Sequence, residues 1–298
     1  MADNVANSST LLPYTEENPS PAKRQRVEPG AGVSRPPPGT SPRPSSALNS
    51  ANGTQPTSDG IEVHKTRFSS KPSVPRGMES YTHFKDARRT ALVALICQRD
   101  DPTSVIDLLR EIATDPSPSS NTFDVDTILD EKGHSALHLA ASMGRMQTVE
   151  ALISSGADIH RGNYLGETPL IRACLATHNS DHQTFHTLVM YLHPSIRTLD
   201  TSKKSVIHHI ISLAGVKGRA VVARYYLDQI FFWIAQHEGG DFRSIVDLQD
   251  DNGDTGLCIA ARVGNRSLVR TLLDVGANRL LPNKLGMRPG DFGVESEV

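Results

Sequence analysis

The chain has 298 residues, a formal net charge of −2 and three well-separated cysteines, Cys97, Cys174 and Cys258. This near-neutral balance excludes a global attraction to nucleic acid or to a membrane surface, and the lack of a C-x-x-C pair argues against a disulfide framework or a cysteine-based zinc site. No apolar run reaches the roughly 20 residues of a membrane span, and the N-terminus lacks the basic flank and apolar core of a signal peptide, so we expect a soluble intracellular protein.

Residues 1–78 are dominated by Pro, Ser, Gly, Asn and Thr. Such a segment buries too little apolar surface to offset the entropy of ordering, and we predict that it is disordered. Within it, Lys23, Arg24 and Arg26 form a compact basic cluster that resembles a nuclear import signal. The competing interpretation is a few solvated charges in a linker. The cluster predicts a nuclear protein, with shuttling to the cytoplasm left open.

Ser20 precedes this cluster in the pattern Ser-Pro-x-Lys, which cyclin-dependent kinases favour. A phosphate there adds roughly two negative charges beside the basic cluster. We therefore expect phosphorylation of Ser20 to weaken nuclear import. Ser20→Asp and Ser20→Ala variants should consequently differ in nuclear fraction under fluorescence microscopy, and identical distributions would contradict the hypothesis.

Residues 79–129 carry two predicted helices. Leu92, Leu95 and Ile96 have the spacing of a buried helix face. The Asp101-Pro102 pair then gives a helix start signal, and the apolar residues after it predict a second helix. Two short helices and a loop correspond to a degenerate repeat. We therefore interpret this segment as a helical N-terminal cap.

A unit of about 33 residues begins at residue 130. Gly133 and Gly166 lie one such period apart, and this is the period of ankyrin repeats. Ser135-Ala136-Leu137-His138 occupies the T-P-L-H position of such a repeat, and Gly156-Ala157-Asp158 closes its second helix. The pattern predicts an all-α fold, an ankyrin-repeat solenoid that follows the helical cap and the disordered region.

The later repeats are less regular than the first. The second, which contains Thr168-Pro169-Leu170, exceeds the period by about four residues, and we expect the insertion at 178–184. The third is longer by about 17 residues, and 218–238 predicts one long helix there. The last is only partial, as expected of a piece of a longer protein. Within 130–298, the expected repeats span 130–162, 163–199, 200–249, 250–282 and a partial 283–294.

On the long helix, apolar and aromatic residues approximate one face: Val222, Tyr225, Tyr226, Ile230, Trp233 and Ile234. We favour core packing for this stripe, with a partner groove as the alternative. His138 and His208 occupy the last position of the T-P-L-H pattern, where an imidazole is expected to tie helix ends to neighbouring loops. His209 is interpreted as another structural histidine.

His178, His182 and His186 follow one another at i, i+4 and i+8, and zinc sites use imidazoles at such spacing. The polar loop around them favours a solvated insertion instead. The sequence contains no catalytic or phosphate-binding motif, and the repeats have no basic stripe for DNA phosphates. We therefore predict that the chain is not an enzyme and has no metal or cofactor site.

Several segments together are similar to one family: 161–179, the triplet His208-His209-Ile210, 218–230, 259–277 and 282–294. They resemble the ankyrin domain of the fungal cell-cycle transcription factors, the subunits of the MBF and SBF complexes, over about 84–294. The resemblance implies a nuclear protein that controls transcription at entry into S phase. It also implies a heteromeric complex, with an APSES-domain transcription factor subunit as protein partner and DNA contacted indirectly.

The sequence departs from this family in several respects. It has neither the APSES winged-helix domain of the DNA-binding members nor the helical dimerisation region at the family's C-terminus. Ser135 to Leu139 differs mildly from the family's T-A-L-H-W, and Cys258 stands where Asn is usual. We expect either a co-regulator subunit or a fragment of a sequence-specific DNA-binding APSES factor that lacks its DNA-binding domain. An unrelated cytoplasmic ankyrin adaptor is the remaining alternative.

The leading hypothesis is a protein-interaction scaffold, because ankyrin stacks present loop tips and inner helices as a concave surface. For any single tip residue, an ordinary solvated turn is the competing interpretation. The candidate partner contacts are Glu131, Lys132, Tyr164, Leu165, Lys203, Lys204, Asp251 and Asn252.

Overall fold

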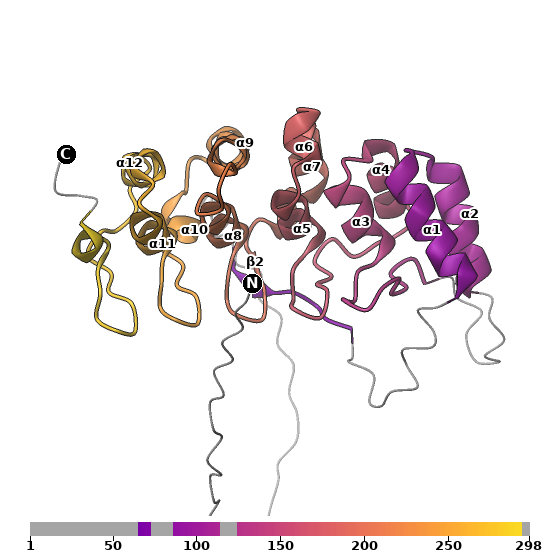
Figure 1. Cartoon of the computed structure of the whole chain (residues 1–298), viewed down its shortest axis with the longest axis horizontal. Coiled ribbons are helices and arrows are strands. Elements are labelled where there is room, and N and C mark those ends of the chain that lie inside the picture. Colours follow the sequence, from indigo (N-terminus) through magenta and orange to yellow (C-terminus); the bar gives the residue numbers. More distant parts are fainter. Residues whose placement is uncertain (1–64, 73–85, 114–123, 294–298) are drawn as a thin grey trace, which may run out of the picture. The chain divides into compact units, whose positions relative to one another are not determined.

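The computed structural model describes residues 65–72, 86–113 and 124–293, all within the unit Gly60–Val298. These residues form a row of helix pairs whose connecting loops turn toward one side (Figure 1). Among them, no helix is both long and apolar enough to cross a bilayer. The helix bounds are α1 Ala87–Gln98, α2 Pro102–Ala113, α3 Ala136–Ser142, α4 Met146–Ser154, α5 Pro169–Leu175, α6 His178–Asp181, α7 Phe185–Leu192, α8 Val206–Leu213, α9 Ala220–His237, α10 Arg243–Val246, α11 Gly256–Val263 and α12 Arg266–Asp274, with 3-10 turns η2 His193–Ser195 and η3 Pro289–Phe292.

Each repeat contributes an inner and an outer helix. The inner helices α3, α5, α8 and α11 pack on one another in sequence, and η3 closes against α11. The outer partners α4, α7, α9 and α12 pack on them, while α1 and α2 pack on α3 and α4. The predicted cap helices are thus present. The two predicted irregularities are confirmed as well, because α6 occupies the 178–184 insertion and α9 is a single 18-residue helix.

Small side chains allow the inner helices to approach closely. Ala140 and Ala141 on α3 and Ala260 and Ala261 on α11 are all buried. Gly256 is the extreme case, because a Cβ there would meet Ile211 Cδ1 at 2.8 Å. A larger residue at this position would require the Ile211 side chain to shift.

The aromatic stripe of α9 packs into the core, as the sequence analysis favoured. Tyr226, Ile230 and Ile234 are completely buried, while Val222, Tyr225 and Trp233 are half-buried against the same cluster. The buried face of α9 is wider than the predicted stripe, because three further residues of the helix are buried beside it: Ala223, Leu227 and Phe231.

The helix starts follow the predicted chemistry. Thr168 Oγ1 accepts a hydrogen bond from the Ile171 amide at 3.4 Å, and Pro169 fills the first helical position, where its missing N–H costs nothing. Thr255 caps α11 through the Cys258 amide at 3.2 Å. Asp101 caps α2 by accepting from the Ser104 amide at 3.2 Å. These short-range signals therefore set the helix boundaries.

The prediction of disorder for 1–78 does not hold for 65–72, whereas residues 1–64 and 73–78 lie outside the described part of the chain. Residues 65–72, called the strap below, include strand β1 (Arg67–Phe68), which pairs in parallel with β2 (Thr198–Leu199). Ser70 forms a further parallel bridge with Arg161. Main-chain hydrogen bonds order this segment despite its polar composition.

The loop tips share one turn that is built around an Asp or Asn side chain. Asp200 Oδ1, for example, accepts from the amides of Ser202 and Lys204, both at 2.8 Å. The fourth residue of each such turn has a positive φ, and it is glycine except for Lys203, whose φ is 59°. A side chain in this left-handed conformation is strained.

Replacing Lys203 by glycine should therefore raise the free energy of unfolding by about 0.5–1 kcal/mol, since the relief of strain exceeds the added freedom of the unfolded chain. Urea denaturation measures the change. Lys204→Gly is the matched control, because Lys204 does not have a positive φ and the same substitution there should be destabilising. A destabilising Lys203→Gly would contradict the prediction.

Candidate functional site

The loop tips are joined to one another by main-chain hydrogen bonds. The Tyr164 amide donates to the Lys132 carbonyl at 3.0 Å, and the Thr201 amide donates to the Leu165 carbonyl at 3.1 Å. The ladder continues with Asp251 N to Ser202 O and Lys284 N to Asn252 O, both at 2.9 Å. Successive tips are thus held in one register and form a continuous edge, called the tip row below.

The structure places the eight predicted contact residues along this tip row. Tyr164 and Lys204 are half-buried, and the other six are exposed. Lys203 Nζ pairs with Asp251 Oδ1 at 3.3 Å, an exposed ion pair between adjacent tips. Lys284 and Leu285 also belong to this row and were not among the predicted contacts, although they follow Asn283 as Tyr164 and Leu165 follow Asn163. Leu165 and Leu285 are 62% and 85% exposed, so the row offers apolar as well as charged contacts.

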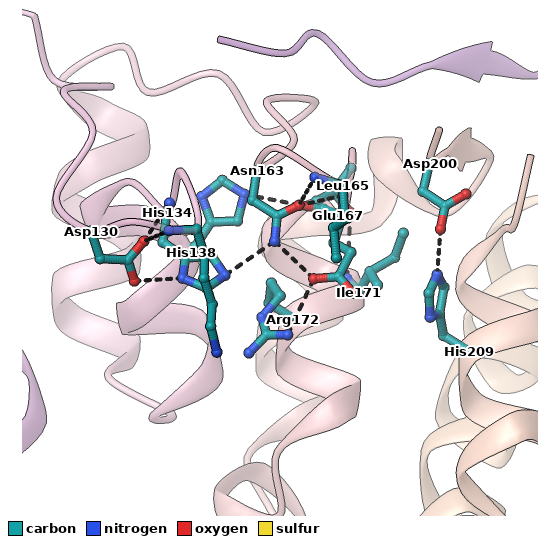
Figure 2. A network of polar contacts seen from close by, with 12 residues as sticks. Asp130, His134, His138, Asn163, Leu165, Glu167, Ile171, Arg172, Asp200 and His209 are labelled. Atoms are coloured by element: carbon teal, nitrogen blue, oxygen red, sulfur yellow. Dashed lines mark hydrogen bonds and ion pairs between the residues drawn. The ribbon is translucent and has the colours of Figure 1, made fainter. Parts of the chain in front are cut away.

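A polar network lies directly behind the first two tips (Figure 2). His134 Nδ1 lies 2.7 Å from Asp130 Oδ2, and its Nε2 lies 3.1 Å from Asn163 Nδ2. Asn163 Nδ2 also donates to Glu167 Oε2 at 2.8 Å, and Arg172 pairs with the same oxygen at 3.1 Å. Side chains from consecutive repeats are therefore linked into one chain of contacts.

Burial alone would raise the pKa of Asp130, but the hydrogen bonds from His134 outweigh it and hold the pKa below its usual value. Asp130 therefore stays ionised and fixes the His134 ring. His209 Nε2 makes the corresponding contact to Asp200 Oδ2 at 2.9 Å, which confirms that His209 is structural. In the fourth repeat, Arg262 Nη1 pairs with Asp254 Oδ2 at 2.5 Å.

His138 and His208 tie helix starts to the next loop, as predicted. The amides of Ser135 and Ser205 donate to Nδ1 of His138 and His208, both at 3.2 Å. With Nδ1 as acceptor, Nε2 carries the proton and donates to a carbonyl of the following repeat. These bonds reach Glu167 O at 3.0 Å and Asp254 O at 3.1 Å. Both imidazoles are thus neutral structural connectors.

The stability of the stack should depend on pH because of His138. Burial lowers the pKa of His138 from 6.5 to about 3, and burial also lowers the pKa of His208. As the pH falls below 6.5, the unfolded chain binds a proton that the folded chain does not. The contribution of the neutral His138 to the free energy of unfolding is therefore fully present above this pH. Below it, the free energy of unfolding falls by about 1.4 kcal/mol per pH unit because of His138.

Urea denaturation at pH 7.5 and pH 5.5 measures this loss. His138→Asn removes the titrating ring, and the difference between the two pH values should shrink by about 1.4 kcal/mol. An unchanged difference in this variant would show that His138 is not the titrating group.

The three histidines spaced at i, i+4 and i+8 are not brought onto one helix. His178 begins α6, His182 follows its end, and His186 lies on α7, where the ring contacts Thr187 Oγ1 at 3.1 Å. Within the described ranges, no group of three or more His, Cys, Asp or Glu side chains is arranged to hold a metal ion. The import cluster Lys23, Arg24 and Arg26 and the candidate phosphorylation site Ser20 lie outside the described residues.

The stacked helix pairs, the T-P-L-H connectors and the linked tips define an ankyrin-repeat protein. Models of the ankyrin-repeat family match residues 94–193 (three copies) and 252–284 (a single repeat). The solved Swi6 ankyrin-repeat fragment from Saccharomyces cerevisiae is 32% identical, with a TM-score of 0.62. The match covers 80% of this chain and 96% of the fragment.

Two curated relatives are similar to this chain over more than half of its length. The start control protein cdc10 of Schizosaccharomyces pombe is 40% identical over 182 residues, which are 59% of this chain and 24% of the relative. Transcription factor SWI6 of Pyricularia oryzae is 34% identical over 63% of this chain and 24% of the relative. The chain therefore spans about a quarter of the length of these relatives. It belongs to the ankyrin-repeat family of the fungal cell-cycle MBF and SBF transcription factors.

Proposed function

We propose that this chain is a protein-interaction scaffold in a nuclear transcription factor complex that controls entry into S phase. The observation that carries the proposal is the 32% identity to the Swi6 fragment across 96% of that fragment. The match covers 80% of this chain and is therefore not confined to one regular repeat. Relatives named as a start control protein and as a transcription factor point to the same process.

The partner we propose is an APSES-domain transcription factor subunit, through which the complex contacts DNA. The tip row supports this assignment as the contact surface. Its hydrogen-bonded ladder presents charged and apolar side chains in a fixed arrangement, and a preorganised surface loses less conformational freedom on binding. Leu165 and Leu285 are the exposed apolar side chains that a partner would bury most readily.

Affinity purification of the full chain after its expression in fungal cells, with mass spectrometry of the bound proteins, tests the proposal. We expect an APSES-domain protein to co-purify, and Leu165→Asp combined with Leu285→Asp to reduce its recovery at least tenfold. Val221→Asp is the matched control, because Val221 is 80% exposed on α9, away from the tip row.

If the tip variant recovers as much of the APSES-domain protein as the wild type does, the contact surface lies elsewhere on the chain. Absence of an APSES-domain protein would count against the complex itself. If the chain were also confined to the cytoplasm with Lys23, Arg24 and Arg26 intact, the result would favour the cytoplasmic adaptor instead.

A further inference from the structure

The strap, residues 65–72, is held on the loop side of the stack by main-chain hydrogen bonds (Figure 1). The amide of Ser69 donates to the Leu199 carbonyl at 2.9 Å, and the amide of Ser70 donates to the His160 carbonyl at 3.1 Å. In return, the Gly162 amide donates to the Ser70 carbonyl at 2.6 Å. The strap thus bridges the loops that follow the first and second repeats.

Two glycines make room for the strap. A Cβ at Gly162 would meet the Gly166 main chain and Ser69 Oγ, both at 2.7 Å, and a Cβ at Gly166 would meet the Thr201 nitrogen at 2.7 Å and Ser69 Oγ at 2.9 Å. Any side chain at these positions would displace the strap or the loop. The close fit indicates a defined seat for this segment.

One side-chain hydrogen bond anchors the strap to an acidic group. Ser70 Oγ donates to Asp158 Oδ2 at 2.6 Å. The Asp158 amide in turn donates to Asp126 Oδ2 at 3.0 Å, and Asp126 Oδ1 is buried without a hydrogen-bond partner. The positively charged or titratable groups that act on this pair of carboxylates are His160 and Arg67 at Asp158 and Arg161 at Asp126. A second anion at Ser70 would therefore be placed directly against a carboxylate whose neighbour is also acidic.

The sequence around Ser70 suits a particular class of enzyme. Arg67 stands three residues before Ser70, in Arg67-Phe68-Ser69-Ser70. Basophilic protein kinases read an arginine at this spacing through carboxylates that pair with its guanidinium. Arg67 and Phe68 are exposed in the docked strap. Because few side chains of the strap are buried, its local opening costs little and presents the extended form that a kinase binds.

We propose that Ser70 is a phosphorylation site of an arginine-directed protein kinase and that phosphorylation releases the strap. In the reaction, Ser70 Oγ forms a bond to the γ-phosphorus of ATP, and the bond from that phosphorus to the β–γ bridging oxygen breaks. ADP leaves, and the hydroxyl proton passes to the base of the kinase. The anchoring donor is thereby replaced by an acceptor group with roughly two negative charges facing Asp158. This inference does not rest on the proposed complex, because it concerns contacts within the chain.

The first test is modification itself. The full chain is incubated with ATP and the catalytic subunit of a basophilic kinase, and the products are mapped by tandem mass spectrometry. We expect phosphate at Ser70 and at least a tenfold slower reaction in Arg67→Ala. The proposal fails if Ser70 remains unmodified, or if the rate at Ser70 is the same in Arg67→Ala.

The second test measures release of the strap. Phosphoserine is encoded at position 70 of the full chain, and amide hydrogen exchange is followed by mass spectrometry. The amides of Ser69, Ser70 and Gly162 should exchange at least tenfold faster, while those of α5 and α8 stay protected. Thr66→phosphoserine is the control, because Thr66 is an exposed residue of the same strap. Unchanged protection at Ser69 and Gly162 in the chain phosphorylated at Ser70 would overturn the proposal.

A third variant separates charge repulsion from simple crowding. Asp158→Asn keeps the carbonyl oxygen that can accept from the His160 amide, a bond of 2.8 Å in the unchanged chain. It also replaces the repelling oxygen by an amide donor. In this background, phosphorylation of Ser70 should change exchange of the strap amides by less than twofold. If phosphorylation of Ser70 still raises the exchange rate of the strap amides tenfold in Asp158→Asn, repulsion by Asp158 is not what releases the strap.

Discussion

Replacing Arg197 by methionine is expected to lower the free energy of unfolding by about 3–5 kcal/mol. The side chains of Arg197 and Glu238 are only 6% and 8% exposed, and they form an ion pair. Arg197 Nη2 also donates to Ser244 Oγ at 2.9 Å and to the Asp241 carbonyl at 3.2 Å. Removing the guanidinium leaves the Glu238 carboxylate buried without its cation, which costs more than the pair contributes when intact.

Urea denaturation followed by circular dichroism measures this loss. Lys203→Met is the control, since Lys203 and Asp251 form a pair with side chains 51% and 49% exposed. Such exposed pairs contribute less than about 1 kcal/mol. Combining Arg197→Met with Glu238→Gln should recover part of the stability, because no charge is then left buried. A loss below about 1 kcal/mol in Arg197→Met would show that water reaches Glu238.

Replacing Tyr226 by alanine should cost about 3–5 kcal/mol, because it removes a completely buried ring from the centre of α9. The ring packs on Phe185 with a centroid separation of 4.4 Å. The hydroxyl donates to the Ala176 carbonyl at 2.7 Å and accepts from the Ser180 amide at 3.2 Å. Tyr226 therefore fastens the insertion that contains α6 to the long helix.

Tyr226→Phe separates the two contributions. It keeps the ring and leaves the Ala176 carbonyl without its donor, so we expect a loss of about 1–3 kcal/mol and faster amide exchange in α6. Phe232→Ala is the control on the same helix, because Phe232 is 62% exposed, and it should change stability by less than about 0.5 kcal/mol. Equal stability of Tyr226→Phe and wild type would mean that the hydroxyl does not anchor α6.

The parts of the fold that depend on short-range chemistry could be predicted from the sequence. The Thr168-Pro169 start of α5 and the connector role of His138 involve residues within one repeat or the next loop. Their physical signals, a cap and a helical period, are local. For the same reason, the insertion at 178–184 could be located by counting against the repeat period.

Interactions between distant segments could not be predicted in this way. The strap docks mainly through main-chain groups, which every polypeptide possesses, and the Ser70 hydroxyl supplies a side-chain hydrogen bond that no sequence pattern marks. Arg197 and Glu238 meet because the long third repeat folds back, and neither residue has a sequence pattern that marks it as buried. Leu285 is a different case, because it stands in its turn as Leu165 stands in the Asn163 turn, so this tip residue could have been found from the repeat pattern.

The strap also has a consequence for how the chain is made. Ser70 and Asp158 are 88 positions apart, whereas repeats of a solenoid otherwise fold against their immediate neighbours. At a synthesis rate of about 5–20 residues per second, the strap leaves the ribosome on the order of ten seconds before its complete seat, which includes β2, exists. During this interval the unpaired main-chain groups of β1 can bind the exposed strand edge of another chain or a chaperone. The strap, although synthesised before the repeats, can thus dock only after the first two repeats have been made.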